Sequence, residues 1–138
     1  MTKQARAANI AAELAKSADA LAASRQLLEI GLRDDAMARL YYSMFHLVSA
    51  ALLTIGVEAT SHRALHSLLS LHLVRPGHIS AGSARILGEL FTLRNQADYD
   101  RHFEVDAASA QSAIQAAAAL ATELKAVIAA RRFAVPTD

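Results

Sequence analysis

The chain has 138 residues, with 14 lysine and arginine side chains against 13 aspartate and glutamate side chains, and it contains no cysteine. This length suits a single domain that buries a core of its own. The nearly even charge argues against a broad basic face for non-specific DNA binding, and the lack of cysteine excludes disulfides, thiol nucleophiles and cysteine-type zinc sites.

The first half of the chain predicts two long helices. Apolar residues spaced by fours and sevens predict a first helix over residues 3–30, which Gly31 ends. Asp34 or Asp35 is expected to cap a second helix, which Gly56 stops. The residues expected to face inward are Ile10, Leu14, Leu21 and Leu28, then Met37, Leu40, Tyr41, Met44, Val48, Ala51, Leu52 and Ile55.

The middle of the chain predicts a short helix followed by a longer one. Ser61 is a natural cap for the short helix, and Pro76-Gly77 closes it. Ser80 or Ser83 opens the next helix. The residues expected to face inward are Leu65, Leu68 and Leu69, then Ile86, Leu87, Leu90 and Phe91.

The last part of the chain predicts a break, a fifth helix and a tail. The Asp-Tyr-Asp-Arg-His segment at residues 98–102 interrupts the fourth helix, Asp106 caps the fifth, and residues 131–138 form a frayed tail. The inward residues of the fifth helix are expected to be Ile114, Ala117, Ala118, Ala121, Leu124 and Ile128.

These elements predict an all-α fold. Alanine and leucine dominate, and no run of alternating β-branched residues is long enough for a strand. We expect one domain over residues 1–138, with its core at about residues 5–130. Its architecture would be an antiparallel four-helix bundle with the short third helix as an insert. The alanine-rich first and last helices leave a shallow apolar face that a second copy could cover.

Neither a signal peptide nor a membrane span is evident in the sequence. Charged residues from Lys3 to Asp19 interrupt the N-terminal segment. The longest apolar run, at residues 47–57, contains polar residues and is too short to cross a bilayer. We therefore expect a soluble, cytoplasmic protein with no membrane partner.

Arg94 is the most informative single residue, because it falls on the apolar stripe of the fourth helix. A cation that faces a core is costly unless a negative group meets it. Asp98, one turn further on, can form an ion pair with it, worth about 0.2–0.5 kcal/mol if exposed. Alternatively, the guanidinium can bind a phosphate through two hydrogen bonds. The sequence leaves both interpretations open.

Asn95 and Tyr99, like Arg94, can be interpreted either as ligand-binding residues or as structural ones. Asn95 can hydrogen-bond a phosphate or sugar, or it can simply be a residue near a helix end. Tyr99 offers an aromatic face for a base and a hydroxyl, or it is a half-buried anchor.

The second helix carries a polar line beside its apolar stripe. Arg39, Tyr42, Ser43 and His46 are spaced at i, i+3, i+4 and i+7, so they share one face of the helix. This line can face a partner helix, face Arg94 across the bundle, or be a solvated surface with an incidental histidine.

Two histidines of the third helix are spaced as a metal pair. His62 and His66 lie at i,i+4, which suits chelation. No third ligand is placed by the sequence, and the glutamate of a His-Glu-x-x-His motif is missing. We therefore expect neither a metal site nor a cofactor.

Three segments in this order resemble the HEPN superfamily. They are Asp35-Ala-Met-Ala-Arg-Leu-Tyr-Tyr-Ser-Met-Phe-His46, Ser61-His-Arg-Ala-Leu-His66 and Leu93-Arg-Asn-Gln-Ala-Asp-Tyr-Asp100. Together they are similar to a small stand-alone prokaryotic branch of that superfamily, over about residues 5–130. The resemblance implies a helical bundle that forms a homodimer, with the arginine elements of the two subunits facing a shared cleft. Many such proteins are metal-independent ribonucleases, and several are toxins or partners of a small MNT-type nucleotidyltransferase.

The ribonuclease signature of that superfamily is matched in part. It has an arginine, usually followed by a polar residue, and then a histidine after four to six intervening positions. Arg94 and Asn95 match its start, but His102 comes after seven intervening residues. On a continuous helix the two would be separated by about 12 Å along the axis. Both could reach one phosphate only if the chain turns after Asp98 or if the second subunit supplies one of them.

The resemblance leads to two hypotheses. In the enzyme hypothesis, Arg94 stabilises the phosphate, Asn95 orients it, and His102 or His46 moves the proton, with Asp98 as another candidate base. The residues expected to bind the nucleotide or RNA are Arg39, Tyr42, Asp98, Tyr99 and Arg101. In the competing hypothesis the same residues form a non-catalytic module that binds nucleotide or docks a nucleotidyltransferase. Tyr99 also resembles the tyrosine that relatives modify with adenylate. A purely structural helical adaptor is the less favoured third interpretation.

Overall fold

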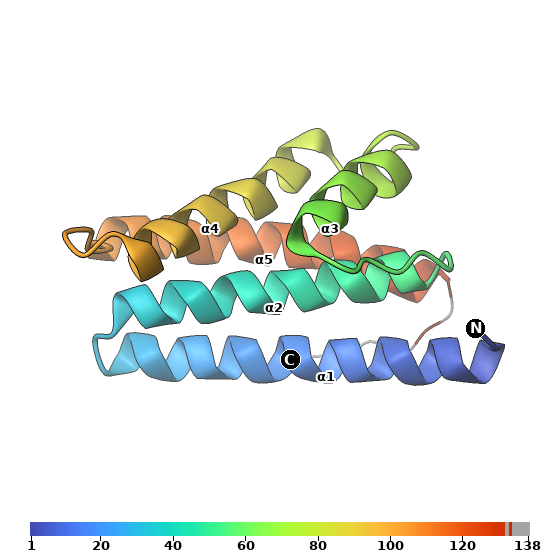
Figure 1. The fold of residues 1–138 in the computed structure, drawn as a ribbon, viewed down its shortest axis with the longest axis horizontal. Helices are drawn as coiled ribbons and strands as arrows, with labels where there is room; N and C mark the ends of the chain where they lie inside the picture. The colour runs from blue at the N-terminus through green and yellow to red at the C-terminus, as the bar shows by residue number, and fades with distance from the viewer. Residues whose placement is uncertain (132, 134–138) are drawn as a thin grey trace.

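The protein is all-α in the computed structural model, which describes residues 1–131 and 133. The described part of the chain contains five α-helices, one π-helical segment and no strand, as predicted (Figure 1). The elements are α1 (Lys3–Glu29), α2 (Arg33–Leu53), α3 (His62–Leu69), η1 (Ser70–Val74), α4 (Ala81–Tyr99) and α5 (Ala107–Ala130). The tail predicted at 131–138 lies largely outside the described residues.

The helices pack around α2. In Figure 1, α1 and α4 run in one direction and α2 and α5 in the other, and α3 crosses near the C-terminal half of α2. α2 contacts α1, α3, α4 and α5, and most of its residues from 36 to 53 are buried. Any side chain on the remaining partly exposed edge of α2 is therefore close to several other helices.

Most helix starts follow the predicted caps. Ser61 accepts a hydrogen bond from the N–H of Ala64, and Asp106 accepts one from the N–H of Ser109. Ser80, the first of the two candidates for α4, accepts from the N–H of Ser83. These caps depend only on residues within three positions, so the sequence is enough to locate them.

The predicted cap of α2 is wrong. The helix begins at Arg33, and Leu32 occupies the cap position without a side-chain hydrogen bond. Asp34 instead accepts from the N–H of Val105 over 2.8 Å, while Arg33 Nε donates to the carbonyl of Val105 over 2.7 Å. Because the loop before α5 docks on the start of α2, a tertiary contact takes the carboxylate that local pattern assigned to a cap.

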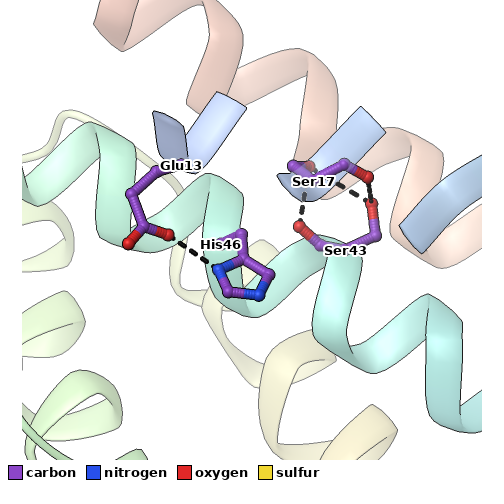
Figure 2. A network of polar contacts seen from close by, with 4 residues as sticks. All are labelled: Glu13, Ser17, Ser43 and His46. Atoms are coloured by element: carbon purple, nitrogen blue, oxygen red, sulfur yellow. Dashed lines mark hydrogen bonds and ion pairs between the residues drawn. The ribbon is translucent and has the colours of Figure 1, made fainter. Parts of the chain in front are cut away.

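A reciprocal pair of serines joins α1 to α2. Ser17 Oγ donates to the carbonyl of Ser43, and Ser43 Oγ donates to the carbonyl of Ser17, each over 2.8 Å (Figure 2). Ser43 is 1% exposed and faces α1, so this member of the polar line follows the interpretation in which the line faces a partner helix. The small side chains allow close approach of the two helices and set their register.

The apolar stripe of α5 differs slightly from the prediction. Ala118, expected to face inward, is exposed, while Ala117, Leu120 and Leu124 are buried. By length and composition α5 is the one helix among the described residues that could cross a membrane, and 33% of its most apolar stretch is buried. Its buried stripe packs against α2 and α4, as in the core helix of a bundle.

Candidate functional site

Arg94 faces inward from α4, and its side chain is 15% exposed. Nη2 donates to the Tyr42 hydroxyl over 2.8 Å, and Nη1 donates to Asn95 Oδ1 over 3.1 Å. Nε lies 3.0 Å from Asp98 Oδ2, an ion-pair contact that lacks hydrogen-bond geometry. The predicted Arg94–Asp98 pair is therefore present, and Tyr42 of α2 is a partner that spacing along α4 could not show.

Aromatic rings surround the two guanidinium groups of this region. The Arg94 guanidinium carbon lies 5.3 Å from the centre of the Tyr42 ring and 5.9 Å from that of Tyr99. The exposed Arg39 lies 4.9 Å from the centre of the same Tyr42 ring. Tyr99 is 76% exposed, so its ring is open to a ligand rather than a half-buried anchor. We name the six residues Arg39, Tyr42, Arg94, Asn95, Asp98 and Tyr99 the Arg94 cluster.

The charges of the Arg94 cluster suit an anion. Two guanidinium groups contact one tyrosine ring, and the Asp98 carboxylate forms an ion pair with one of them, Arg94. Within residues 1–131 and 133, Arg39 has no ion-pair partner. A phosphate that contacts Arg39 and Arg94 would bring the missing negative charge, and guanidinium groups match phosphate geometry well.

His46 lies on the same side of α2, held by a carboxylate that the sequence analysis missed. Its Nδ1 is 2.7 Å from Glu13 Oε2 of α1, and Figure 2 shows the other ring nitrogen directed away from Glu13. The two side chains are 21% and 29% exposed. A carboxylate at Nδ1 fixes the tautomer and orientation of an imidazole.

His46 and part of the Arg94 cluster line one open groove between α1 and α2. Its volume is about 410 Å³. The lining residues are Lys16, Asp19, Ala20, Ala23, Arg39, Tyr42 and His46. Lys16 and Arg39 are the cations of this groove and Asp19 is its carboxylate, and Tyr42 connects the groove to Arg94 of α4.

The structure does not bring the other predicted residues to Arg94 within one protomer. α4 ends at Tyr99 and the chain turns, so His102 and Arg101 lie exposed in the connection to α5. His102 donates its backbone N–H to Asp100 Oδ1. Among the described residues, no hydrogen bond, ion pair or ring contact joins either side chain to Arg94.

His62 and His66 contact a buried tyrosine. The Tyr41 hydroxyl lies 2.8 Å from His62 Nδ1 and 3.3 Å from His66 Nε2. In the described part of the chain no group of three or more histidine, aspartate or glutamate side chains is placed to hold a metal ion. The Tyr41 hydroxyl thus occupies the position between the two rings that a metal ion chelated by His62 and His66 would need.

Burial and the Arg94 charge control the protonation of this histidine pair. Burial first, and then the charge of Arg94, lower the pKa of His62 below its ordinary value of 6.5. Burial and the neighbouring His62 lower the pKa of His66. Burial raises the pKa of Tyr41, so its hydroxyl stays protonated. The imidazole rings of His62 and His66 are therefore both neutral at neutral pH.

Three residues of this region were missed as polar site residues: Glu13, Lys16 and Tyr41. Each was recognised only as a charge on the first helix or as a member of an apolar stripe. Spacing along one helix does not give the register of the helix packed against it, so no sequence signal pairs Glu13 with His46.

Comparisons with known proteins agree with the motifs. The HEPN domain family model matches residues 11–127 of this chain. A Methanocaldococcus jannaschii protein named as a candidate toxin is 36% identical over 91 residues, which cover 64% of this chain and 68% of that protein. A second protein of that organism with the same description is 29% identical over 90 residues, covering 65% and 61%. A Pyrococcus horikoshii protein of the UPF0332 group is 37% identical over 67 residues, covering 49% and 47%.

Proposed function

Because the chain belongs to the HEPN family, we propose that it binds RNA phosphate at the Arg94 cluster and cleaves RNA there without a metal ion. We further propose that it acts as the toxin of a toxin–antitoxin or defence pair, which the names of two relatives support. The observation that carries the proposal is the juxtaposition of two guanidinium groups on Tyr42 with the carboxylate-held His46.

The chemistry of metal-free RNA cleavage matches these residues. The reaction needs cations that offset the phosphate charge and groups that move protons. Arg94 and Arg39 supply the charge, and Asn95 holds one nitrogen of the Arg94 guanidinium in place. We assign His46 the role of proton donor to the leaving 5′-oxygen, because the Glu13 contact at Nδ1 holds its ring with the other nitrogen directed away from Glu13.

A homodimer would complete the signature. Tyr99, Arg101 and His102 are exposed at the C-terminal end of α4 and directly after it. In the proposed dimer these residues of one protomer approach the Arg94 cluster of its partner, so that His102 serves the neighbouring site.

The test of the ribonuclease proposal is cleavage of total RNA and isolated tRNA by the purified protein in EDTA. Arg94→Ala is expected to lower the rate by about 100-fold or more, because it removes a cation aimed at the phosphate. Arg85→Ala is the matched control, since Arg85 is an exposed arginine of the same helix with no interaction among the described residues. An unchanged rate in folded Arg94→Ala protein would end the proposal.

The second candidate is a non-catalytic module that binds nucleotide or an MNT-type nucleotidyltransferase. It is favoured by the lack of contact between His102 and Arg94, and by the exposed Tyr99 beside Arg94. It predicts a stable complex with a transferase encoded beside this chain, and transfer of adenylate from ATP to Tyr99. Mass spectrometry of wild type and Tyr99→Phe after incubation tests this, and an unmodified Tyr99 with no complex on co-purification would contradict it.

A further inference from the structure

The proposed cleavage requires a proton acceptor as well as the donor His46, and within one protomer α3 places a histidine near the phosphate-binding residues. His62 is the first residue of α3 and is half-buried. Its ring contacts the Tyr42 ring edge-on, with 6.1 Å between centres, and lies 4.7 Å from that of Phe45. Tyr42 is also the residue that accepts from Arg94. His62 and Arg94 therefore lie on the same tyrosine side chain.

The free nitrogen of His62 is available for chemistry. Nδ1 is engaged by the Tyr41 hydroxyl at 2.8 Å, and the two rings are stacked with 5.6 Å between centres. Across residues 1–131 and 133, Nε2 of His62 has no hydrogen-bond partner. A histidine held at Nδ1 with an unoccupied Nε2 has the arrangement of a general base or acid.

The Tyr41 hydroxyl has only one proton to donate in a hydrogen bond. One O–H can donate to only one of the two histidine nitrogens that face it, and the other ring must then donate to the oxygen. If His62 Nδ1–H donates to Tyr41 and Tyr41 donates to His66 Nε2, the lone pair of His62 Nε2 is free. This arrangement satisfies both contacts of the Tyr41 hydroxyl and leaves His62 able to accept a proton, whereas the reverse arrangement satisfies the same contacts but puts the proton of His62 on Nε2.

We propose that His62 is the general base of the Arg94 site, and that Tyr41 and His66 carry its proton away from the phosphate. The proposal rests on the ribonuclease function above and adds a catalytic residue to it. Tyr41 and His66 act through His62, so they are positioning residues.

The reaction balances with these groups. The 2′-O–H bond breaks, its proton passes to His62 Nε2, and the 2′-oxygen forms a bond to phosphorus. The P–O5′ bond breaks, and the 5′-oxygen takes a proton from His46 Nε2. The products are a 2′,3′-cyclic phosphate and a free 5′-hydroxyl.

The buried pair explains how His62 can be protonated beside an arginine. As Nε2 gains a proton, Nδ1–H passes to the Tyr41 oxygen while the Tyr41 proton passes to His66 Nε2. Tyr41 stays neutral throughout, and the positive charge ends on His66. Arg94 lowers the pKa of His62, whereas the lowering at His66 comes from burial and from His62, so the relay moves charge away from the guanidinium.

The experiment uses two forms of one RNA oligonucleotide, made around a site that the wild-type protein cleaves in total RNA. One form has the natural 5′-oxygen at the scissile bond, and the other has sulfur there. The thiolate leaves without a donated proton because a thiol is far more acidic than an alcohol. Loss of a general acid is therefore repaired by the sulfur substrate, and loss of a general base is not.

His62→Asn is the main variant, since its amide can still reach Tyr41 while Nε2 is lost. We expect kcat to fall by about 100-fold or more on both substrates, with KM little changed. His46→Asn should fall similarly on the oxygen substrate and recover on the sulfur substrate. His72→Asn, at a histidine with no interaction among the described residues, should retain the wild-type rate.

The outcomes separate the two proposals. If the wild type cleaves and His62→Asn cleaves equally fast, the base assignment is wrong while the ribonuclease function stands. Recovery of His62→Asn on the sulfur substrate would also overturn the assignment, because it would make His62 the acid. If the wild-type protein cleaves no RNA, the proposed function fails and the role of His62 fails with it.

A second measurement does not depend on a folded variant. Long-range ¹H–¹⁵N correlation spectra of the wild-type protein at neutral pH report which nitrogen of each histidine carries the proton. We expect the proton of His62 on Nδ1, with Nε2 unprotonated, and the proton of His66 also on Nδ1. A proton on His62 Nε2 in the neutral ring would contradict the proposal.

Discussion

Two histidines of this protein, His46 and His62, lie near Tyr42 and differ in what holds them. His46 is held at Nδ1 by the Glu13 carboxylate on the groove between α1 and α2. His62 is held at the same nitrogen by the neutral Tyr41 hydroxyl, close to Arg94. Burial and the nearby Arg94 cation favour the neutral form of His62. The same nitrogen is therefore engaged in both histidines but by different partners, and this difference is the basis for the different proton-transfer roles that we propose for them.

The largest expected effect on RNA cleavage comes from a change at Arg94, the cation proposed to bind the phosphate. Arg94→Lys keeps the charge but loses the fork of donors that now reaches Tyr42 and Asn95. We expect kcat/KM for RNA to fall by about 100-fold, as for loss of one donor aimed at developing charge. Cleavage assays measure this loss, with Arg85→Lys as the control. A loss of less than about threefold, as expected for an exposed surface residue, would show that the paired donors of the Arg94 guanidinium are not needed.

The next largest effect on kcat is expected from a change at Glu13, the partner of His46. Glu13→Gln keeps the shape of the side chain but removes the charge opposite Nδ1. Removal of a group that supports a metal-bound histidine typically costs about 10- to 100-fold, and we expect a loss of kcat of that order here. Glu29→Gln, at an exposed glutamate of the same helix, is the control. A pH–rate profile that does not change between Glu13→Gln and wild type would assign Glu13 a structural role only.

A smaller effect sharpens the His62 side. Tyr41→Phe leaves His62 Nδ1 and His66 Nε2 without their shared partner, which should cost about 1–3 kcal/mol of unfolding free energy. The relay is also lost, so imidazolium would form at His62 beside Arg94. We expect the acid side of the pH–rate profile to change in this variant, and urea denaturation to show the destabilisation. A lower stability with an identical pH–rate profile would make Tyr41 a packing residue only.

The smallest expected effect is a pH dependence of stability. The folded-state pKa of both His62 and His66 is below that of the unfolded chain, so the unfolded state binds protons first as pH falls. Stability should therefore be full above the unfolded value of 6.5 and decrease as pH falls from there through the lowered folded values. The groups that face His62 are Tyr41, Tyr42, His66 and Arg94.

Urea denaturation at neutral and mildly acid pH measures this dependence. Each histidine can contribute at most about 1.4 kcal/mol per pH unit. The slope should be smaller in His62→Asn, with His72→Asn as the control. Equal slopes in both variants and wild type would mean that His62 does not titrate differently on unfolding.

Part of the candidate site was accessible from the sequence because it lies within one helix. Arg94 on an apolar stripe and Asp98 four residues later predicted an inward cation with a carboxylate contact, and both are present. The polar line of α2 was also visible in the sequence, but spacing left open whether it faces a partner helix, Arg94 or solvent. In the structure Tyr42 contacts Arg94, and Ser43 is buried against α1. The contact of Asp34 with Val105 instead of a helix cap shows where local pattern fails, because a distant loop competes for the same side chain.

The sequence by itself determined the helices, their caps at Ser61 and Asp106, and the inward direction of Arg94, and it narrowed the cap of α4 to Ser80 or Ser83. Each of these depends on residues within about one turn of helix, where propensity, capping and periodicity act. The tertiary structure alone decided that Glu13 holds His46 and that α3 brings His62 to Tyr41. Those pairings depend on the register between packed helices, which is set by the fit of side chains that are far apart in the chain.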